Sequence, residues 1–370
     1  MMRIEVIYKK EAPKLLNNTA FWNHTFFATT KHRLYAHYKN PNANDNDVIL
    51  LLAYLDEESF GYMGVFNDII SIHGKLNKIG WLSTWWVYPK TKGTGIAREI
   101  LNEMHGGVKG KIGISQFTPS AKRVYDKSGF FVDLKVNKGI KAVLRSNLAF
   151  VLPAFFEKTR MLVPLFNLAD KAINFFVNIK LKIQKVGIRN RLQEIKLEYV
   201  VTIDQETLTI IDAFSQNHIS PKNAAFFEWL KTYFWVQEAP LLRNTEKSKY
   251  EFSSFDDTFN IYLIKIIKNN NCIGFLVLQK RNYVMKLLFA YYDSALYSKV
   301  LADIILLQSI TQNVREIICY DENIKLEFSK SSAFLYRTKK TKQAIISKDF
   351  NVTNFEDEIV NFGDGDCSFA

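Results

Sequence analysis

The sequence predicts an α/β protein with two tandem copies of one domain, each a mixed sheet with helices around it, joined by a basic, apolar helical connector. Strand-like apolar runs alternate with helical segments over the first part of the chain. A similar succession returns in the last part, after a stretch that is apolar, basic and helical in its periodicity. These observations divide the chain into a first domain over 1–146, a connector over 147–196, a second domain over 197–350 and an acidic tail over 351–370.

The length and composition suit two globular domains in a reducing compartment. The chain has 370 residues, 48% of them hydrophobic and 23% charged, which is typical of a folded protein with room for two cores. Its three cysteines, Cys272, Cys319 and Cys367, form no CxxC pair, so we expect neither a disulfide framework nor a metal site. The first residues lack the apolar core of a signal peptide, and no apolar run reaches the roughly 18 residues of a membrane span. We therefore expect a cytoplasmic protein.

The positive charge is concentrated in one segment. The chain has a formal net charge of +12, and residues 138–196 hold twelve Lys or Arg against three acidic residues, a net +9. The rest is nearly neutral, so we expect no nucleic-acid partner. A helix over 163–185 would place apolar residues on a wide arc, with Lys180, Lys182 and Lys185 near its end. This pattern predicts that residues 147–185 contact the inner face of the membrane or a hydrophobic partner; the alternative is an interdomain helix buried on both sides.

The elements of the first domain follow from apolar spacing and turn residues. Short apolar runs predict strands, and apolar side chains at helical spacing predict helices. Pro119 and Gly129 mark the start and end of one helix, and Asn137-Lys138-Gly139 indicates a turn. The expected elements are strands at 48–55, 60–66, 80–88 and 111–115, helices at 95–105 and 119–127, and a closing hairpin over 130–146.

The second domain is predicted from weak internal similarity at a separation of roughly 200 residues. Residues 259–278 consist of two apolar runs around a polar turn and resemble 48–66. Residues 327–334 resemble 124–131 in the same way. The matching order of these segments predicts a repeated fold.

A glycine turn, Lys92-Gly93-Thr94-Gly95-Ile96-Ala97, opens the expected helix at 95–105. It does not fit the G-x-x-x-x-G-K-[ST] pattern of nucleotide triphosphatases, and it lacks the third small residue of the G-x-G-x-x-G dinucleotide fingerprint. Glycines let the backbone approach a ligand, and successive N–H groups at a helix N-terminus form an anion site. The turn therefore indicates a phosphate ligand.

Three motifs in order resemble the GNAT (Gcn5-related) family of acyl-CoA N-acyltransferases. The glycine turn resembles the family's [Q/R]-x-x-G-x-[G/A] loop, with Lys92 in the first position. Residues 120–130 resemble its late motif, a helix that ends in Tyr-x-x-x-Gly-Phe, and residues 85–89 stand where the family has a splayed strand. The resemblance implies a GNAT-like fold for residues 1–146 and a coenzyme A thioester, most simply acetyl-CoA, as donor. The implied coenzyme A contacts are Val87, Lys92, Gly93, Thr94, Gly95, Ile96 and Ala97.

The resemblance also implies the chemistry, in which an amine attacks the thioester directly. Tyr125 matches the tyrosine that protonates the leaving thiolate. The family's frequent glutamate base is missing from residues 81–86, which leaves a water relay through Ser83 or Thr84, or a base from elsewhere. The early helical region is where the family recognises its acceptor. The remaining candidates for the base or for acceptor binding are His32, Arg33, His37, Asn40, Asp68 and His73.

The second copy lacks the residues that carry this chemistry. It has no glycine between Phe275 and Phe362, and Phe328 stands where the first copy has Tyr125. We therefore expect a degenerate GNAT-like domain whose segment 291–305 cannot approach a pyrophosphate and which shapes the acceptor site. The acidic tail is expected to be solvated, unless its phenylalanines dock it on the protein.

The leading functional hypothesis is an acetyl-CoA-dependent N-acyltransferase. Its expected acceptor is a small-molecule amine such as an amino sugar or sugar nucleotide of cell-envelope polysaccharide synthesis, because a basic segment suits anionic, membrane-proximal substrates. One alternative is an aminoacyltransferase of the Fem type, which the tandem architecture resembles. Another is a non-enzymatic membrane-surface adaptor with a vestigial acyltransferase domain.

Overall fold

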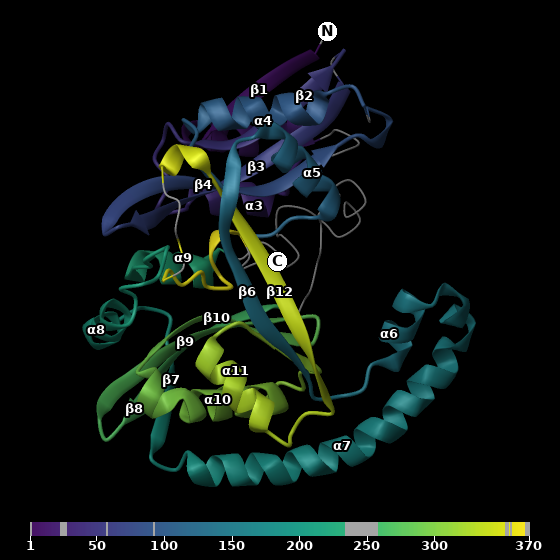
Figure 1. The fold of residues 1–370 in the computed structure, drawn as a ribbon, viewed down its shortest axis with the longest axis vertical. Helices are drawn as coiled ribbons and strands as arrows, with labels where there is room; N and C mark the ends of the chain where they lie inside the picture. Colours follow the sequence, from purple (N-terminus) through teal and green to yellow (C-terminus); the bar gives the residue numbers. More distant parts are fainter. Residues whose placement is uncertain are drawn as a thin grey trace.

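The computed structural model describes residues 2–22, 28–56, 58–91, 93–233, 258–351, 355 and 357–366. Its centre is a sheet of twelve strands in the order β1-β2-β3-β4-β5-β12-β6-β11-β10-β9-β8-β7. Strands β1 to β4 lie at one end of the molecule and β7 to β10 at the other, with β6 and β12 running between them (Figure 1).

The first half forms five strands at one edge of the sheet, β1 to β5. The first four are antiparallel neighbours, and β5 is parallel to β4. Alternate residues of β2 face opposite sides. Leu51 packs with α4, whereas Leu50 and Leu52 pack with the α1–α3 region, so helices cover both faces. The bounds are β1 Met2–Tyr8, β2 Val48–Leu55, β3 Glu58–Ile72, β4 Lys75–Val87, β5 Ile112–Ile114, η1 Lys9–Glu11, α1 Ala12–Leu16, α2 Thr19–Trp22, α3 Lys31–Tyr38, η2 Pro89–Thr91, α4 Ile96–Gly107 and α5 Pro119–Ser128.

The second half repeats this arrangement from the opposite edge. Strands β7 to β10 are antiparallel neighbours, and β11 is parallel to β10, as β5 is to β4. The prediction of two copies of a mixed α/β domain is therefore confirmed. The bounds are β7 Ile195–Tyr199, β8 Asn260–Lys268, β9 Asn271–Arg281, β10 Val284–Tyr292, β11 Glu316–Cys319, α8 Gln205–Ala213, α9 Ala224–Thr232, α10 Ser294–Thr311, α11 Glu322–Lys330 and η5 Lys348–Phe350.

The last strand of each copy is exchanged into the other copy's part of the sheet. Strand β12 (Tyr336–Ser347) pairs with β5 of the first copy, and β6 (Phe131–Val143) pairs with β11 of the second. The two strands also pair with each other in antiparallel fashion over their whole lengths (Figure 1). Because neither copy closes its sheet with its own last strand, the halves form one continuous body.

The predicted closing hairpin over 130–146 is wrong. Asn137, Lys138 and Gly139 lie within β6, and β6 continues straight through them. A Cβ atom on Gly139 would lie 2.6 Å from Cδ1 of Tyr320 and 2.7 Å from the carbonyl oxygen of Cys319. The glycine therefore permits close approach of the segment after β11 and does not mark a turn.

The two copies share one apolar core across their boundary. Phe66 and Trp81 of the first copy belong to the same buried cluster as Phe226 and Phe289 of the second. The indole Nε1 of Trp229 in α9 donates a 2.9 Å hydrogen bond to the carbonyl oxygen of Ala36 in α3. These contacts fix α9 of the second copy against α3 of the first.

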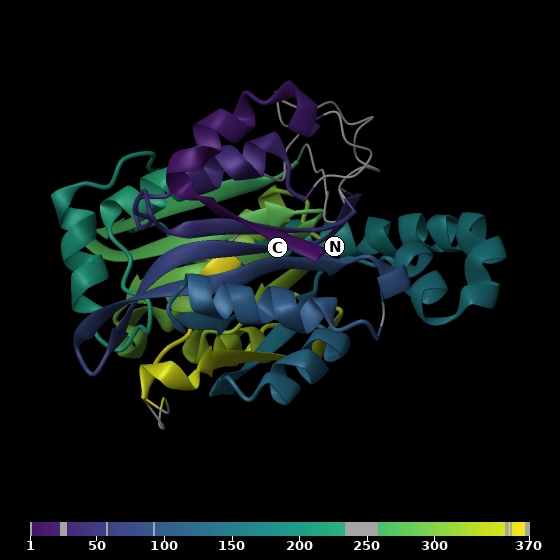
Figure 2. The same ribbon diagram turned by 90° about the horizontal axis from the view of Figure 1, so that it is seen from above.

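Between the copies, a helical arm projects from the body. It consists of α6 (Leu148–Phe155), η3 (Glu157–Leu162) and α7 (Val163–Arg191), and its tip extends well beyond the sheet (Figure 2). The buried carboxylate of Asp170 fixes its base by accepting hydrogen bonds from Ser146 Oγ (2.5 Å) and from the backbone N–H groups of Leu148 (2.8 Å) and Ala149 (3.0 Å). No helix in the described part of the chain is long and apolar enough to cross a bilayer.

Candidate active site

A V-shaped opening in the sheet lies between β4 and β5. The two strands pair only at Gly80–Ile112 and Trp81–Gly113, although β4 continues to Val87. Beyond Trp81 the strands therefore diverge, and β5 leaves that edge of β4 unpaired. This is the splayed arrangement that the GNAT resemblance predicts around residues 85–89.

A β-bulge lies at the start of this opening. On one side of it Val65 faces Leu82, and on the other Met63 faces Trp85, so Ser83 and Thr84 both oppose Gly64. The glycine makes room for the bulge, because a Cβ atom there would lie 2.9 Å from Thr84 Oγ1. A bulge interrupts the regular ladder of backbone hydrogen bonds, and here it does so at Ser83 and Thr84 of β4.

The glycine turn leads from β4 into α4. Gly93 and Gly95 both have φ of 89°, a left-handed conformation that favours glycine, and Gly95 is the N-cap of α4. Lys92 lies outside the described residues. The N–H groups of Ile96 and Ala97 are in the first helical turn and have no acceptor among the described residues. The positive end of α4 thus presents backbone donors beside the opening.

Two threonines beside the glycines make local hydrogen bonds. Thr91 is buried, and its N–H and Oγ1 both donate to the carbonyl oxygen of Tyr88, at 2.9 Å and 2.7 Å. The N–H and Oγ1 of Thr94 likewise both donate to the carbonyl oxygen of Thr91, at 3.1 Å and 2.7 Å. A cavity of about 1110 Å³ lies alongside, lined in part by Trp86 and Tyr88. Thr91 and Thr94 are therefore fixed by hydrogen bonds, and open space lies next to them.

Tyr125 of α5 lies close to the splayed strand. It is almost fully buried, and its ring packs on Trp85 with centroids 5.2 Å apart and on Phe131 at 5.4 Å. Burial, and secondly the nearby carboxylate of Asp366, raise the pKa of the Tyr125 phenol. The phenol therefore keeps its proton at neutral pH and has one to donate. Gly129 ends the helix with φ of 73°, as the sequence predicts.

Polar side chains from both ends of the chain meet at the bulge. The Arg33 guanidinium in α3 donates a hydrogen bond to Ser83 Oγ and lies 3.4 Å from Oδ2 of Asp366. Burial raises the pKa of the Asp366 carboxyl, and the charge of Arg33 and a hydrogen bond with Ser83 oppose that rise. An arginine, a serine and an aspartate thus converge on the β-bulge.

Two of the other predicted acceptor residues of the early helical region, His37 and Asn40, serve the interior of the fold. His37 is fully buried against Phe66, and burial lowers the pKa of its imidazole to about 3. Asn40 supports the backbone, because its Nδ2 donates to the carbonyl oxygen of Asn67 at 2.7 Å. The pKa of His32 is lowered by burial, and its Nδ1 has no partner among the described residues. Of this predicted cluster, Arg33 is the residue whose contacts place it at the bulge.

Asp68 and His73 also lie away from the opening. His73 is exposed in the turn between β3 and β4, and the ten residues to Ser83 span about 33 Å along a strand. Asp68 has no exposed side-chain surface and lies 2.6 Å from the Lys222 ammonium. Distance excludes His73 as a base, and burial in an ion pair excludes Asp68.

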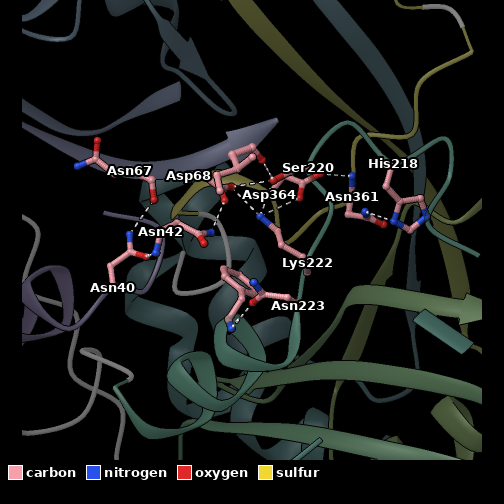
Figure 3. A network of polar contacts seen from close by, with 12 residues as sticks. Asn40, Asn42, Asn67, Asp68, His218, Ser220, Lys222, Asn223, Asn361 and Asp364 are labelled. Atoms are coloured by element: carbon pink, nitrogen blue, oxygen red, sulfur yellow. Dashed lines mark hydrogen bonds and ion pairs between the residues drawn. The ribbon is translucent and has the colours of Figure 1, made fainter. Parts of the chain in front are cut away.

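Asp68 belongs to a buried polar network that joins the two copies (Figure 3). Lys222 Nζ contacts Asp68 Oδ2, Ser220 Oγ at 2.7 Å and Asp364 Oδ1 at 3.7 Å. The second oxygen of Asp68 accepts a 2.9 Å hydrogen bond from Asn42 Nδ2. Burial raises the pKa of Asp364 to about 6, although the Lys222 charge opposes the shift. Two carboxyls from distant segments thus share one ammonium.

The C-terminal segment, residues 357–366, docks along the boundary between the copies. The N–H of Gly363 donates to the carbonyl oxygen of Leu288 in β10 at 3.1 Å. Gly365 has φ of 70°, and a Cβ atom there would lie 2.8 Å from Ser115 Oγ and 3.3 Å from Trp81 Cγ. The expectation of a solvated tail is wrong for these residues, because the Gly-Asp-Gly-Asp sequence fits against both copies.

The second copy's equivalent opening is built differently. The carboxylate of Asp293 caps α10 and accepts hydrogen bonds from the N–H groups of Ala295 (2.9 Å) and Leu296 (3.3 Å). It takes the place that an anion takes at a helix N-terminus. A cavity of about 240 Å³ remains beside β10, where Tyr292 donates a 2.8 Å hydrogen bond to Asp321. The geometry agrees with the expectation that this copy cannot accept a pyrophosphate.

Asp366 is the site residue that the sequence analysis misses. It is separated from Arg33 by 333 positions, and no local pattern links the two. The signal present in the sequence is the Gly-Asp-Gly-Asp run itself, since alternating glycines indicate close backbone approach. Among the described residues, no group of three or more His, Cys, Asp and Glu side chains is placed to hold a metal ion.

Comparison with known proteins agrees with this geometry for the first copy. Residues 13–132 match the family model of the acetyltransferase (GNAT) domain, a range that includes the bulge, the glycine turn and Tyr125. The resemblance inferred from these motifs is thus confirmed. A comparison with curated protein sequences found no match.

Solved structures of similar shape have low sequence identity. A probable N-acyltransferase from Enterococcus faecalis V583 has a TM-score of 0.49 at 10% identity, over 94% of this chain and 72% of that one. Saccharomyces cerevisiae N-myristoyltransferase with bound myristoyl-CoA has a TM-score of 0.48 at 8% identity, over 93% and 82%. A tandem GNAT protein from the clavulanic acid biosynthesis pathway has a TM-score of 0.45 at 8% identity, over 94% and 98%. At these scores the three structures say nothing about donor or acceptor.

Asp364→Asn should change how stability depends on pH. Because the pKa of Asp364 rises from 3.8 in the unfolded chain to about 6, the folded protein holds a proton between these values that the unfolded chain has lost. This carboxyl therefore destabilises the wild-type protein as the pH rises from 4 to 6. The free energy of unfolding of the variant, relative to wild type, should increase by roughly 2–3 kcal/mol from pH 4 to pH 7. Urea unfolding at both pH values measures it, with Asp357→Asn, an exposed residue of the same segment, as control. A difference that does not change with pH would contradict the assignment.

Proposed function

From the premise that residues 13–132 of this protein are a GNAT acetyltransferase domain, we propose that the protein transfers an acyl group from acetyl-CoA to a small-molecule amine. The observation that carries the proposal is the convergence of three features at one opening in the sheet. These are the left-handed glycine turn at the start of α4, the bulged and half-unpaired strand β4, and the buried Tyr125. The second copy has an aspartate cap and a phenylalanine in the corresponding places.

Each feature has a role in the proposed reaction. The N–H donors of residues 95–97, at the positive end of α4, bind the pyrophosphate of coenzyme A. The β4 edge that β5 leaves unpaired, up to Val87, offers backbone groups to the pantetheine arm. At the bulge, peptide N–H groups stabilise the oxyanion of the attacked thioester carbonyl. Tyr125 gives its proton to the leaving thiolate.

We propose an amino sugar or sugar nucleotide of cell-envelope polysaccharide synthesis as the acceptor. The support is chemical, since Arg33 is a partly buried cation at the bulge and suits a hydroxylated or phosphorylated ligand. It is also consistent with a net charge of +9 over residues 138–196, which attracts anionic substrates. The enzyme would then act in the cytoplasm, at the inner face of the membrane.

The helical arm supports the membrane part of the proposal. More than half of the strongly exposed large apolar side chains among the described residues lie on it, including Phe175 (63% exposed) and Phe176 (71%). Apolar side chains recur along α7 at a spacing close to 3.5 residues, and only some of them pack on the body: Val177, Leu181 and Ile188 join the second copy's core. An ordinary amphipathic helix buries its apolar face, whereas α7 also keeps a second set of apolar side chains exposed. The exposed stripe on α7 consists of Leu165, Leu168, Phe175, Phe176, Ile179, Ile183 and Val186.

Lysines beside this stripe select an anionic lipid surface as its partner. Lys171, Lys180 and Lys182 are exposed on the same helix, whereas its one acidic residue, Asp170, is buried at the base of the arm. A lysine next to an anionic leaflet contributes about 1 kcal/mol to binding. The arm thus combines apolar side chains that enter the interface with charges that face lipid headgroups.

Gly95→Glu should prevent donor binding. The glutamate adds a side chain at φ of 89° and puts a negative charge into the anion site, so affinity for acetyl-CoA should fall at least about a hundredfold, ~3 kcal/mol. Isothermal titration calorimetry with acetyl-CoA measures it. Gly74→Glu is the matched control, because Gly74 has φ of 75° in the β3–β4 turn with nothing within 4 Å of a Cβ atom. Equal affinity of the two variants would remove the glycine turn from the binding site.

Tyr125→Phe should reduce turnover without weakening donor binding. The phenylalanine keeps the packing on Trp85 and Phe131 and removes only the proton donor. With glucosamine as test amine, kcat should fall by about a hundred- to ten-thousandfold while calorimetric affinity for acetyl-CoA stays the same. Thiol release from acetyl-CoA measures the rate. An unchanged kcat would mean that the phenol is not the acid.

The pair of substitutions Phe175→Glu and Phe176→Glu, made together, should abolish membrane binding. The wild-type protein is expected to float with vesicles that contain anionic lipid at low salt, and less at high salt, because screening weakens the lysine contribution. The double variant should stay at the bottom of the gradient. Leu76→Glu, which changes an exposed apolar side chain at the start of β4, should float like wild type. A wild-type protein that never floats would contradict the membrane assignment.

A further inference from the structure

We infer that Asp366, carried by the C-terminal segment, is the general base of the first copy's active site. The inference rests on the proposed function and supplies the group that the site otherwise lacks. Strand β4 has no carboxylate between Trp81 and Trp86, and Asp68 and His73 are excluded by burial and by distance. A base must therefore come from another segment that reaches the bulge.

The C-terminal segment enters the opening between β4 and β5. Gly365 packs against Trp81, the last β4 residue that pairs with β5, and against Ser115, the residue that follows β5. Any side chain at Gly365 would collide with Ser115, so the glycine is what lets the chain pass at this depth. The next residue, Asp366, is thereby delivered to the bulge at Ser83.

The surroundings of Asp366 suit a base. Its carboxylate lies 3.4 Å from the Arg33 guanidinium and interacts with Ser83, and 19% of its side-chain surface is exposed. The charges of Arg33 and Lys342 lower the pKa of Asp366, and the charge of Asp366 in turn raises the pKa of Tyr125. Burial raises the pKa of the carboxyl toward neutrality, where a base works best, and Arg33 keeps part of its charge. The group is thus exposed enough to meet an amine and buried enough to hold a proton.

Asp366 and Tyr125 divide the proton transfers. Asp366 takes one proton from the acceptor's ammonium, and the freed amine nitrogen attacks the thioester carbon. As the C–N bond forms and the C–S bond breaks, the thiolate takes the Tyr125 proton. The nitrogen's second proton restores the phenol, and Asp366 returns its proton to water. The products are the amide, coenzyme A as the thiol and one proton, so atoms and charge balance.

The rest of the segment holds Asp366 in place. Gly363 is hydrogen-bonded to β10 of the second copy, and Asp364 is bound in the network of Lys222 (Figure 3). The degenerate copy therefore acts as the anchor for a segment that completes the active site of the first copy. This gives it a catalytic positioning role although it has no phosphate-binding turn of its own.

The test compares two amines that differ in their need for a base. Glucosamine is largely protonated near neutral pH, whereas hydroxylamine is uncharged at pH 7 and needs no base before attack. With glucosamine, Asp366→Asn should lower kcat for thiol release from acetyl-CoA by about a hundred- to ten-thousandfold. With hydroxylamine, after subtraction of the uncatalysed reaction, the variant should match wild type. Asp366→Glu should restore part of the glucosamine rate, and Asp357→Asn, a change in the exposed part of the same segment, should have no effect.

Each outcome decides the matter. Retained hydroxylamine activity shows that Asp366→Asn is folded and binds acetyl-CoA, so a selective loss with glucosamine supports the base. An equal loss with both amines would assign Asp366 a structural role and overturn the inference, and so would no loss with either. A wild-type protein that binds acetyl-CoA but releases no thiol with either amine would overturn the proposed function and the inference with it.

Discussion

The exchange of the two closing strands is the constraint on which the rest of the structure depends. Strand β12 completes the first copy's part of the sheet and β6 completes that of the second, so each copy folds around a strand from the other. The C-terminal segment follows β12, whose last residues pair with β5 of the first copy; it runs along Asn217 and Ile219 of the second copy and ends at the first copy's opening. Because of this connection, residues at the far end of the chain can enter a site formed by residues 33–125.

The two copies have the same strand order but differ at the N-terminus of the helix that follows the fourth strand. At the start of α4, left-handed glycines leave backbone donors for a ligand, whereas at the start of α10 the Asp293 carboxylate occupies its own donors. The uncapped first turn of α4 is what the proposed donor site requires, whereas the aspartate stabilises the start of α10. The second copy contributes Lys222 and the β10 backbone, which hold the C-terminal segment in place.

How far the sequence predicts this site depends on the separation of the residues involved. The glycine turn and Tyr125 are predicted because each belongs to a local motif with a fixed spacing. Gly139 is misread as a turn residue because the contact that requires a glycine there, the close approach of Tyr320, involves a residue 181 positions away. Asn40, His37 and Asp68 look like ligand residues in the sequence, but their polar groups serve the interior of the fold. Asp366 is missed because contacts of the C-terminal segment with both copies bring it to Arg33, 333 positions away in the sequence.

A structure of the protein in complex with coenzyme A tests the central claim most directly, namely that one active site is assembled from both ends of the chain. The account predicts the pyrophosphate on the N–H groups of residues 95–97 and the sulfur within hydrogen-bonding distance of the Tyr125 hydroxyl. It also predicts that Asp366 stays beside Ser83 and Arg33, across the thiol from Tyr125. Coenzyme A bound at the N-terminus of α10, or a C-terminal segment displaced from the opening by the bound molecule, would contradict it.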